Sequence, residues 1–208
     1  MSLHKLYQNI NDHILLDNQP SGYLNTVYCN PLFRQKPFDL LYRLKETEQS
    51  AKHHPEGNVW NHTLLVLDEA AAVRTKSKNQ QAFMWAALLH DIGKPLATEI
   101  RNGRVTAYDH DKIGAGLAKE FLKIFTDDSN FIQDVTQLIR YHMQILFVVN
   151  DLPFADVRGM IANTDIEEVA LLGLCDRLGR AGCNRRREEK NIELFLKKCR
   201  VTNSKKPT

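Results

Sequence analysis

Several features that mark common protein classes are missing from this sequence of 208 residues. No apolar run approaches the ~20 residues that a membrane-spanning helix needs, so we expect no membrane association. The N-terminus lacks the charged-then-apolar layout of a secretory signal, which predicts a soluble, cytoplasmic protein. Four cysteines show no CxxC spacing and are expected to stay reduced: Cys29, Cys175, Cys183 and Cys199.

A strong excess of one charge is also absent. The net charge is +3, hydrophobic residues make up 43% of the chain and charged residues 25%, which is typical of a folded globular domain. Basic residues gather late in the chain, at Arg177, Arg180 and 185–187. This cluster either suits an anionic substrate or forms the solvated face of a terminal helix, because Glu188 and Glu189 follow directly.

Apolar residues recur at helical spacing over most of the chain, and no internal repeat is present. Segment 25–37 has a poor helical signal and two prolines, Pro31 and Pro37, so it is expected to be a loop. Between residues 98 and 106 the pair Asn102-Gly103 predicts a tight β-hairpin. The pattern therefore predicts an all-α fold with a short β-hairpin insertion, with helices near 3–14, 38–45, 61–73, 79–90, 113–125, 131–142, after 153, at 164–174 and at 192–199.

The most informative motif is the pair His90-Asp91 at the end of an apolar helical run, 83–89. The chain carries an imidazole and a carboxylate to the end of a buried helix, where unpartnered polar groups are costly. Histidine and aspartate are both ligands of divalent metals. A metal ion is thus one partner that would satisfy both groups.

Further ligand types follow the order H…HD…H…H…D along the chain. Any one of these histidines alone is more often a core or surface residue than a ligand, but the set as a whole favours a metal site. Imidazole and carboxylate together suit Mn, Fe, Ni, Co or Zn better than a lone Mg. The additional candidates are His62, His110, His142 and Asp176.

On these residues the chain resembles the HD-domain metal-dependent phosphohydrolases, a superfamily of helical bundles, over roughly residues 55–180. The resemblance implies that His62, His90, Asp91 and Asp176 hold a first metal ion. It implies that His110 and His142 match the extra histidines of members with two ions, and that Asp91 bridges the two. Whether one or two ions bind is left open at this point.

Within the superfamily the chain is most similar to the HD domain of bacterial tRNA nucleotidyltransferases and to related end-healing phosphoesterases. The shared motifs are His54-Pro55-Glu56 ahead of His62-Thr63-Leu64, the doublet itself, and His110 followed by Gly114-Ala115. A nucleotidyltransferase head is not found in the sequence, so nucleotide transfer to tRNA is not expected. The glycine-tyrosine-proline signature of cyclic-di-GMP phosphodiesterases is also missing.

The resemblance implies a metal-dependent phosphohydrolase or phosphodiesterase that cleaves phosphate esters of nucleotides or nucleic-acid ends, 2′,3′-cyclic phosphates included, with a metal-activated water. Asp91 and Lys94 are the expected catalytic residues. Lys94 is expected to contact phosphate, or else to act as a helix C-terminal cation. Arg177 and Arg180 are expected to bind substrate, or else to pair with acids.

Other functional interpretations of these residues remain open. The same residues are compatible with a protein that binds a nucleotide but does not hydrolyse it, or with a metal ion that only holds helices together. They are also compatible with a deoxynucleotide or alarmone hydrolase. Asp109 and Asp111 are candidate partners of His110, and Glu56 of His62. Trp60 and Tyr108 either stack on a base or pack against neighbouring helices.

We divide the chain into an N-terminal helical extension packing on the core at 1–50, an HD core at 51–182, and a C-terminal helix with a basic tail at 183–208. The expected partner is a phosphorylated small molecule or nucleotide, RNA ends among them. The substrate, the native ion and the oligomeric state do not follow from the sequence.

Overall fold

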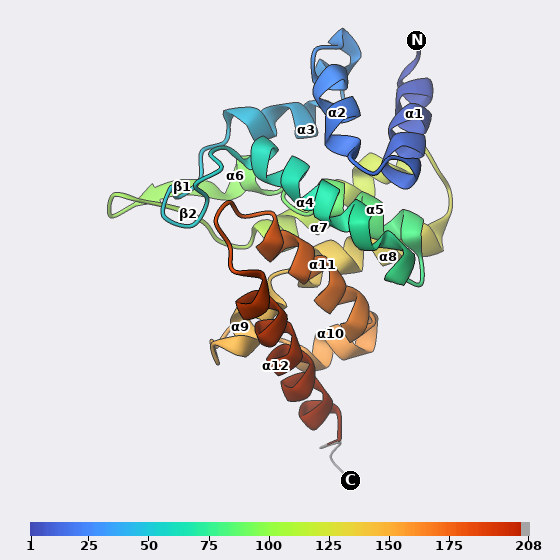
Figure 1. The fold of residues 1–208 in the computed structure, drawn as a ribbon. Helices are drawn as coiled ribbons and strands as arrows, with labels where there is room; N and C mark the ends of the chain where they lie inside the picture. The colour runs from blue at the N-terminus through green and yellow to red at the C-terminus, as the bar shows by residue number, and fades with distance from the viewer. Residues whose placement is uncertain (205–208) are drawn as a thin grey trace.

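The computed structural model describes residues 1–204 and shows a bundle of helices with one two-stranded hairpin at its edge (Figure 1). The last four residues of the expected basic tail, 205–208, lie outside the described residues. The expected all-α fold with a β-hairpin is confirmed. Within residues 1–204 no helix combines the length and the apolar content needed to cross a membrane.

The helices and strands follow one another along the chain, and the longest connection between described elements is the segment 47–58 before α4. The α-helices are α1 Leu3–Leu16, α2 Pro20–Tyr28, α3 Asp39–Tyr42, α4 Val59–Val73, α5 Gln80–Leu89, α6 Lys94–Ala97, α7 His110–Lys123, α8 Ser129–Tyr141, α9 Gln144–Val149, α10 Val157–Asn163, α11 Ile166–Leu178 and α12 Arg185–Ser204. The strands are β1 Thr98–Arg101 and β2 Arg104–Ala107. Short 3-10 helices lie at Pro31–Arg34, Arg43–Glu46 and Arg74–Lys76.

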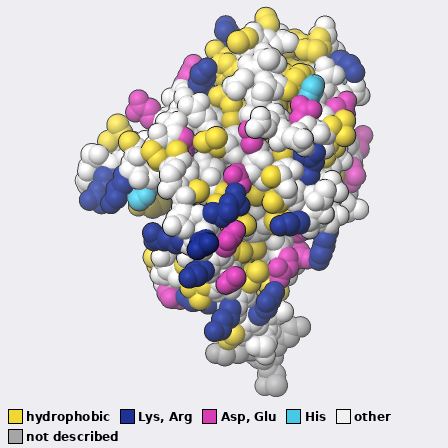
Figure 2. Space-filling view, in the orientation of Figure 1, with side chains coloured by type: hydrophobic (Ala, Val, Ile, Leu, Met, Phe, Trp, Pro, Cys, Tyr) yellow, Lys and Arg dark blue, Asp and Glu magenta, His cyan; other side chains and the backbone are white. Residues whose placement is uncertain are grey.

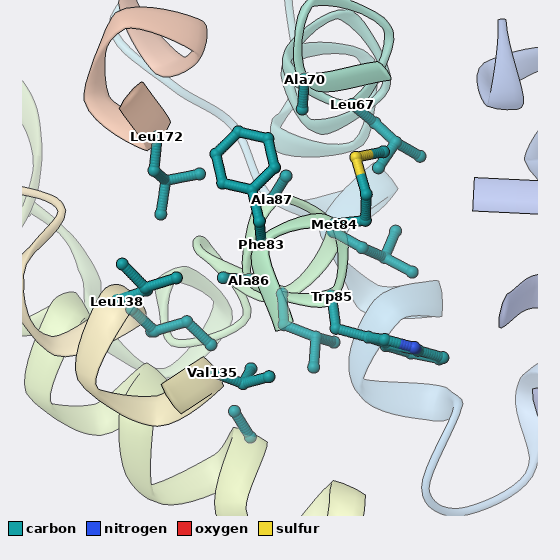
Figure 3. Packing of buried hydrophobic residues seen from close by; sticks show 14 of the residues in the cluster. Leu67, Ala70, Phe83, Met84, Trp85, Ala86, Ala87, Val135, Leu138 and Leu172 are labelled. Atoms are coloured by element: carbon teal, nitrogen blue, oxygen red, sulfur yellow. The ribbon is translucent and has the colours of Figure 1, made fainter. Parts of the chain in front are cut away.

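Helix α5 forms the centre of the core. Nearly all of its side chains are buried, and it contacts α1, α4, α8 and α11. Figure 3 shows Phe83, Trp85 and Ala86 of α5 pointing in different directions, toward side chains of the surrounding helices. A helix that is apolar all round has to be covered on every side, which explains why it occupies the centre. The doublet at its end is therefore carried into the interior.

The predicted hairpin is present where the sequence placed it. Strands β1 and β2 pair antiparallel, with Arg101 opposite Arg104. Asn102 and Gly103 both have positive φ, 50° and 71°, as the two-residue turn of a right-twisted hairpin requires. Because His110 follows three residues after β2, the hairpin leads directly into the site described below.

The expectation of a loop over 25–37 was wrong. Helix α2 runs through Tyr28, and a 3-10 helix follows at Pro31–Arg34. Pro20 stands in the first turn of α2, where its missing N–H costs nothing. The next residue, Ser21, donates from its backbone N–H and its hydroxyl to the Asp68 carboxylate at 3.0 and 2.6 Å. This contact spans 47 residues of chain and has no signal in the local sequence pattern.

Several helix ends also differ from those predicted. Helix α4 is capped by Asn58 rather than Asn61, so His62 is its fourth residue. Helix α7 begins at His110, three residues early, and α11 is capped by Asp165. Helix α9 was not predicted, and α12 extends well beyond the expected 192–199 at both ends. On the face seen in Figure 2, Lys and Arg side chains gather around the start of α12.

Gly93 allows the end of α5 to approach α7 closely. A Cβ at this position would lie 2.2 Å from the carbonyl oxygen of His110 and 2.7 Å from the backbone nitrogen of Gly114. Both atoms belong to the backbone, which cannot give way as a flexible side chain does. The absence of a side chain at Gly93 thus keeps the doublet beside His110.

We predict that Gly93→Ala lowers the free energy of unfolding by roughly 1–3 kcal/mol, the usual cost of overpacking. Gly116→Ala in α7 is the matched control, because a Cβ there meets nothing within 4 Å. That substitution should leave stability unchanged or raise it by up to about 1 kcal/mol, since alanine is the better helix former. Urea denaturation of both variants checks this. Equal stability of the two would contradict the close-approach argument.

Candidate metal centre

The six expected ligands come from five helices and converge in the interior. They lie on α4, at the end of α5, at the start of α7, just after α8 and on α11, which meet near the middle of the molecule in Figure 1. Every one is buried, with exposed fractions of 8% or less. The structure thus brings together His62, His90, Asp91, His110, His142 and Asp176.

Asp91 lies between two pairs of histidines, and each of its carboxylate oxygens faces one pair. Oδ2 is 3.1 Å from Nε2 of His90 and 3.9 Å from Nε2 of His62. Oδ1 is 3.4 Å from Nε2 of His110 and 4.0 Å from Nε2 of His142. Asp91 therefore belongs to two groups of three ligand atoms, each compact enough to surround one ion.

Asp176 joins the group on the Oδ2 side. Its Oδ1 lies 2.9 Å from Nε2 of His62. The guanidinium of Arg180, one turn later on the chain, lies 3.1 Å from Oδ2 of Asp176. Two atoms that bind one ion at about 2.1 Å and at right angles to each other are about 3 Å apart, so these spacings suit ligands of a common ion.

Backbone carbonyl groups fix the orientation of three of the imidazole rings. In His90, His110 and His142, Nδ1 lies 2.7–2.9 Å from the carbonyl oxygen three residues earlier. A carbonyl only accepts, so Nδ1 carries the proton in each ring and the Nε2 lone pair points to the centre. Metal-binding histidines are commonly held in this way.

The resulting arrangement is unfavourable without a cation, which is the strongest indication that a metal fits. Nε2 of His110 and Nε2 of His142 are 3.2 Å apart, so two lone pairs face each other in the interior. Nε2 of His90 and Oδ2 of Asp91 are close together but neither has a well-aligned hydrogen-bond partner among the described residues. A divalent ion in each group would relieve both conflicts.

The pKa values of His142, His110 and Asp91 favour the protonation states that bind metals. Burial would lower the pKa of His62, but its contacts with Asp176 and Glu56 outweigh this effect, so that pKa is raised. Burial, together with the neighbouring His110 and His90, lowers the pKa of His142 to about 3. Burial would raise the pKa of Asp91, but the neighbouring His90 and Lys94 outweigh this and hold it well below the usual range. Asp91 is thus a carboxylate and His142 a neutral ring at neutral pH.

Lys94 lies at the edge of the centre. Its Nζ is 2.8 Å from Oδ2 of Asp91 and donates to Oε1 of Gln49 at 2.6 Å. The side-chain amide of Gln49 also donates to the carbonyl of Gly57 at 3.3 Å. Gln49 was not singled out from the sequence, because it precedes the matched motifs and its contact with Lys94 spans 45 residues.

Glu56 lies beside His62, as expected. Its Oε1 is 3.0 Å from Nδ1 of His62 and 2.8 Å from Nδ1 of His54, a histidine that the sequence did not single out as a functional residue. Oε2 of Glu56 accepts from the backbone N–H of Ala181 at 3.2 Å. Glu56 thus connects the loop before α4 with the loop after α11.

Two other expectations about supporting residues were wrong. Asp109 and Asp111 do not contact the ring of His110: Asp109 pairs with Lys112 and Asp111 with Arg140, at 2.7 and 2.6 Å. Nδ1 of His110 donates instead to the backbone carbonyl of Ala107, the last residue of β2. Asp109 and Asp111 therefore form ion pairs with Lys112 and Arg140 and not with the ring.

The remaining candidates for substrate binding differ in how far they are exposed. Trp60 is buried and packs against Phe33, so it is a core residue and not a base-stacking platform. Tyr108 is 60% exposed and lies two residues before His110 in the chain. Arg177 pairs with Glu188 at 2.8 Å and lines a pocket near the surface together with Arg180.

Comparison with known proteins identifies the family. The family model described as HD domain matches residues 59–180, which is more than half of the chain and includes all six candidate ligands. The chain belongs to the HD domain family.

Curated relatives are named multifunctional CCA proteins. The one from Actinobacillus pleuropneumoniae serotype 5b is 39% identical over 108 residues, which cover 50% of this chain and 24% of the relative. Those from Methylococcus capsulatus and Azoarcus sp. are 28% and 31% identical over 89% and 81% of this chain, and over 37% and 40% of their own length. The chain thus spans less than half the length of these relatives.

The buried histidines predict acid-sensitive folding of the metal-free protein. Burial lowers the pKa of His54 to about 4 and that of His142 to about 3, and it also lowers the pKa of His110. An unfolded chain protonates its histidines near pH 6.5. These histidines therefore contribute fully to the free energy of unfolding above pH 6.5, and their contribution declines as the pH falls toward their pKa values in the folded protein. The raised pKa of His62 opposes this decline in part.

With a chelator present, we expect the free energy of unfolding to fall by roughly 2 kcal/mol or more between pH 7 and pH 5. His142→Asn removes one titrating ring and should reduce the slope by about 1.4 kcal/mol per pH unit. An exposed residue that does not titrate provides the control, Asn130→Ala, which should keep the wild-type slope. Urea titrations at several pH values measure this, and a flat profile for the wild type would refute it.

Proposed function

We propose that this protein is a metal-dependent phosphohydrolase that cleaves phosphate esters of nucleotides or nucleic-acid ends, 2′,3′-cyclic phosphates included. The observation that carries the proposal is the position of Asp91, whose two oxygens face two separate groups of buried histidines. Divalent ions held there would acidify a water, neutralise phosphoryl oxygens and stabilise the leaving oxygen. Membership of the HD domain family supports the same class of chemistry.

The ligands divide into two proposed sets. His62, His90, Asp176 and Oδ2 of Asp91 would hold one ion, and His110, His142 and Oδ1 of Asp91 the other. Glu56 orients His62 through Nδ1, while backbone carbonyls orient the other three histidines. The rings are thus positioned before any ion arrives, which lowers the cost of assembling the site.

Lys94 is proposed to bind the substrate phosphate. An ammonium group has three N–H donors, of which one faces Asp91 and one faces Gln49. The third is available for a phosphoryl oxygen next to the metal centre. Lys94 would then neutralise charge that develops on the phosphate as the ester bond breaks.

The names of the relatives support a role near RNA. Multifunctional CCA proteins share this domain within chains more than twice as long as the matched segment. We propose that the present chain carries the phosphohydrolase part of such chemistry and acts on nucleotide or RNA ends. The metal most compatible with the imidazole-rich set is one of Mn, Fe, Co, Ni or Zn.

We predict that Asp91→Ala loses both metal and activity. Removing the shared carboxylate should lower kcat by about 10³-fold or more, as the loss of several kcal/mol of metal stabilisation implies. Mass spectrometry of the purified protein should show fewer ions per chain than in the wild type. Asp127→Ala, at an exposed aspartate, is the control and should resemble the wild type. Full metal-dependent hydrolysis by Asp91→Ala would disprove the mechanism.

Lys94→Met separates catalysis from metal binding. The ions should remain or bind more tightly, because Asp91 loses a competing cation, while kcat falls by about 10²-fold through loss of one charged donor. Lys119→Met, at an exposed lysine on α7, is the matched control. Hydrolysis of 2′,3′-cyclic nucleotides, nucleoside monophosphates and deoxynucleoside triphosphates with Mn, Co, Ni or Mg provides the assay. Unchanged kcat in Lys94→Met would leave Lys94 without a role in the reaction.

A further inference from the structure

Three consecutive arginines, Arg185, Arg186 and Arg187, form the first turn of α12 and are exposed. Cations at the N-terminal end of a helix face the positive end of the helix dipole, which is unfavourable. Arg185 pairs with Glu69 at 2.8 Å. Within the part of the chain that the structure describes, Arg186 and Arg187 form no ion pair, so their charge is available to a partner.

In the chain these arginines lie between Cys183 and Glu188, two residues that line the pocket near Asp176. The pocket has a volume of about 240 Å³ and is lined by the segment around Lys52, by the loop after α11, and by Glu188 of α12. That volume is below the roughly 300–1,000 Å³ of typical small-molecule sites, so it suits a phosphate group better than a whole nucleotide. Figure 2 shows Lys and Arg side chains gathered on this face around the start of α12.

Two residues that line the pocket contact residues of the candidate metal centre or of its immediate surroundings. Arg180 lines the pocket and contacts the Asp176 carboxylate at 3.1 Å. Ala181 lines it too, and its backbone N–H donates to Glu56, which contacts His62. A chain of phosphates lying over the arginines would therefore have one end within reach of the first ligand set.

We infer that the basic surface formed by Lys52, Arg186 and Arg187 binds the phosphodiester backbone of a nucleic-acid strand whose end reaches the metal centre. This inference rests on the proposed function and makes the substrate a polynucleotide end instead of a free nucleotide. Arginine side chains bind backbone phosphates by charge-assisted hydrogen bonds and without sequence preference. The surface thus positions the strand, and the metal centre acts on its terminal phosphate ester.

Binding is tested first, with metal-loaded protein and a labelled single-stranded RNA that ends in a 3′-hydroxyl and cannot be processed. The double variant Arg186→Glu/Arg187→Glu should bind about tenfold more weakly at low salt, and the slope of log affinity against log salt should shrink by about 1.4. Acidic side chains favour the start of a helix, so this variant should fold as well as the wild type. Fluorescence anisotropy and thermal unfolding measure the two quantities.

The double variant Lys119→Glu/Lys197→Glu is the matched control. It makes the same two charge reversals at exposed positions, one on α7 and one on α12, the latter about 16 Å further along the helix axis from Arg186. It should leave the affinity for RNA near the wild-type value. Equal losses in the control and in Arg186→Glu/Arg187→Glu would show a general charge effect and overturn the inference, as would equal competition by a poly-glutamate peptide of the same charge.

Turnover separates this inference from the proposed function. For an RNA strand ending in a 2′,3′-cyclic phosphate, the Arg186→Glu/Arg187→Glu variant should raise KM about tenfold with kcat unchanged. For a 2′,3′-cyclic mononucleotide, neither constant should change. If KM rises equally for both substrates, the surface is not specific for a strand and the inference fails. If the wild type hydrolyses neither substrate, the proposed function fails, while the anisotropy result still decides strand binding.

Discussion

Burial of Asp91 among four histidines is the constraint on which the rest of the structure depends. A carboxylate in the interior is stable only when its charge is met, and here Lys94 lies 2.8 Å from Oδ2 of Asp91 while Nε2 atoms of four imidazole rings face the two carboxylate oxygens. The rings themselves are fixed by backbone carbonyls, so their lone pairs cannot turn away from one another. The helices are thus packed around groups of ligand atoms that could hold a metal ion.

The apolar helix α5 makes this arrangement possible. Because it is covered by α1, α4, α8 and α11, its end is the point where side chains from several helices meet. Gly93 then lets the start of α7 come close enough for His110 to face Asp91. Packing in the core and geometry at the site are consequences of the same central helix.

The surroundings of the centre differ on its two sides. Toward α7 the exposed hairpin leads into His110, while toward α11 the loop after Asp176 and the start of α12 present arginines. Gln49 and Glu56 connect the segment before α4 to Lys94 and His62. Residues outside the HD family match, which covers 59–180, therefore contribute to the environment of the candidate metal centre. The division of the chain at residues 50 and 182 stays a proposal.

The local sequence was enough to place the main helices, the Asn102-Gly103 turn and the ligand types, because spacing and turn chemistry act within a few residues. It did not predict α2, whose residue Ser21 contacts Asp68 of α4. Nor did it show which oxygen of Asp91 faces which histidines, or that Gln49 binds Lys94. His62 and Asp176 lie 114 residues apart in the chain, and only tertiary packing brings such residues together. The chemistry of the site was thus determined by the sequence, while its geometry was decided by the fold.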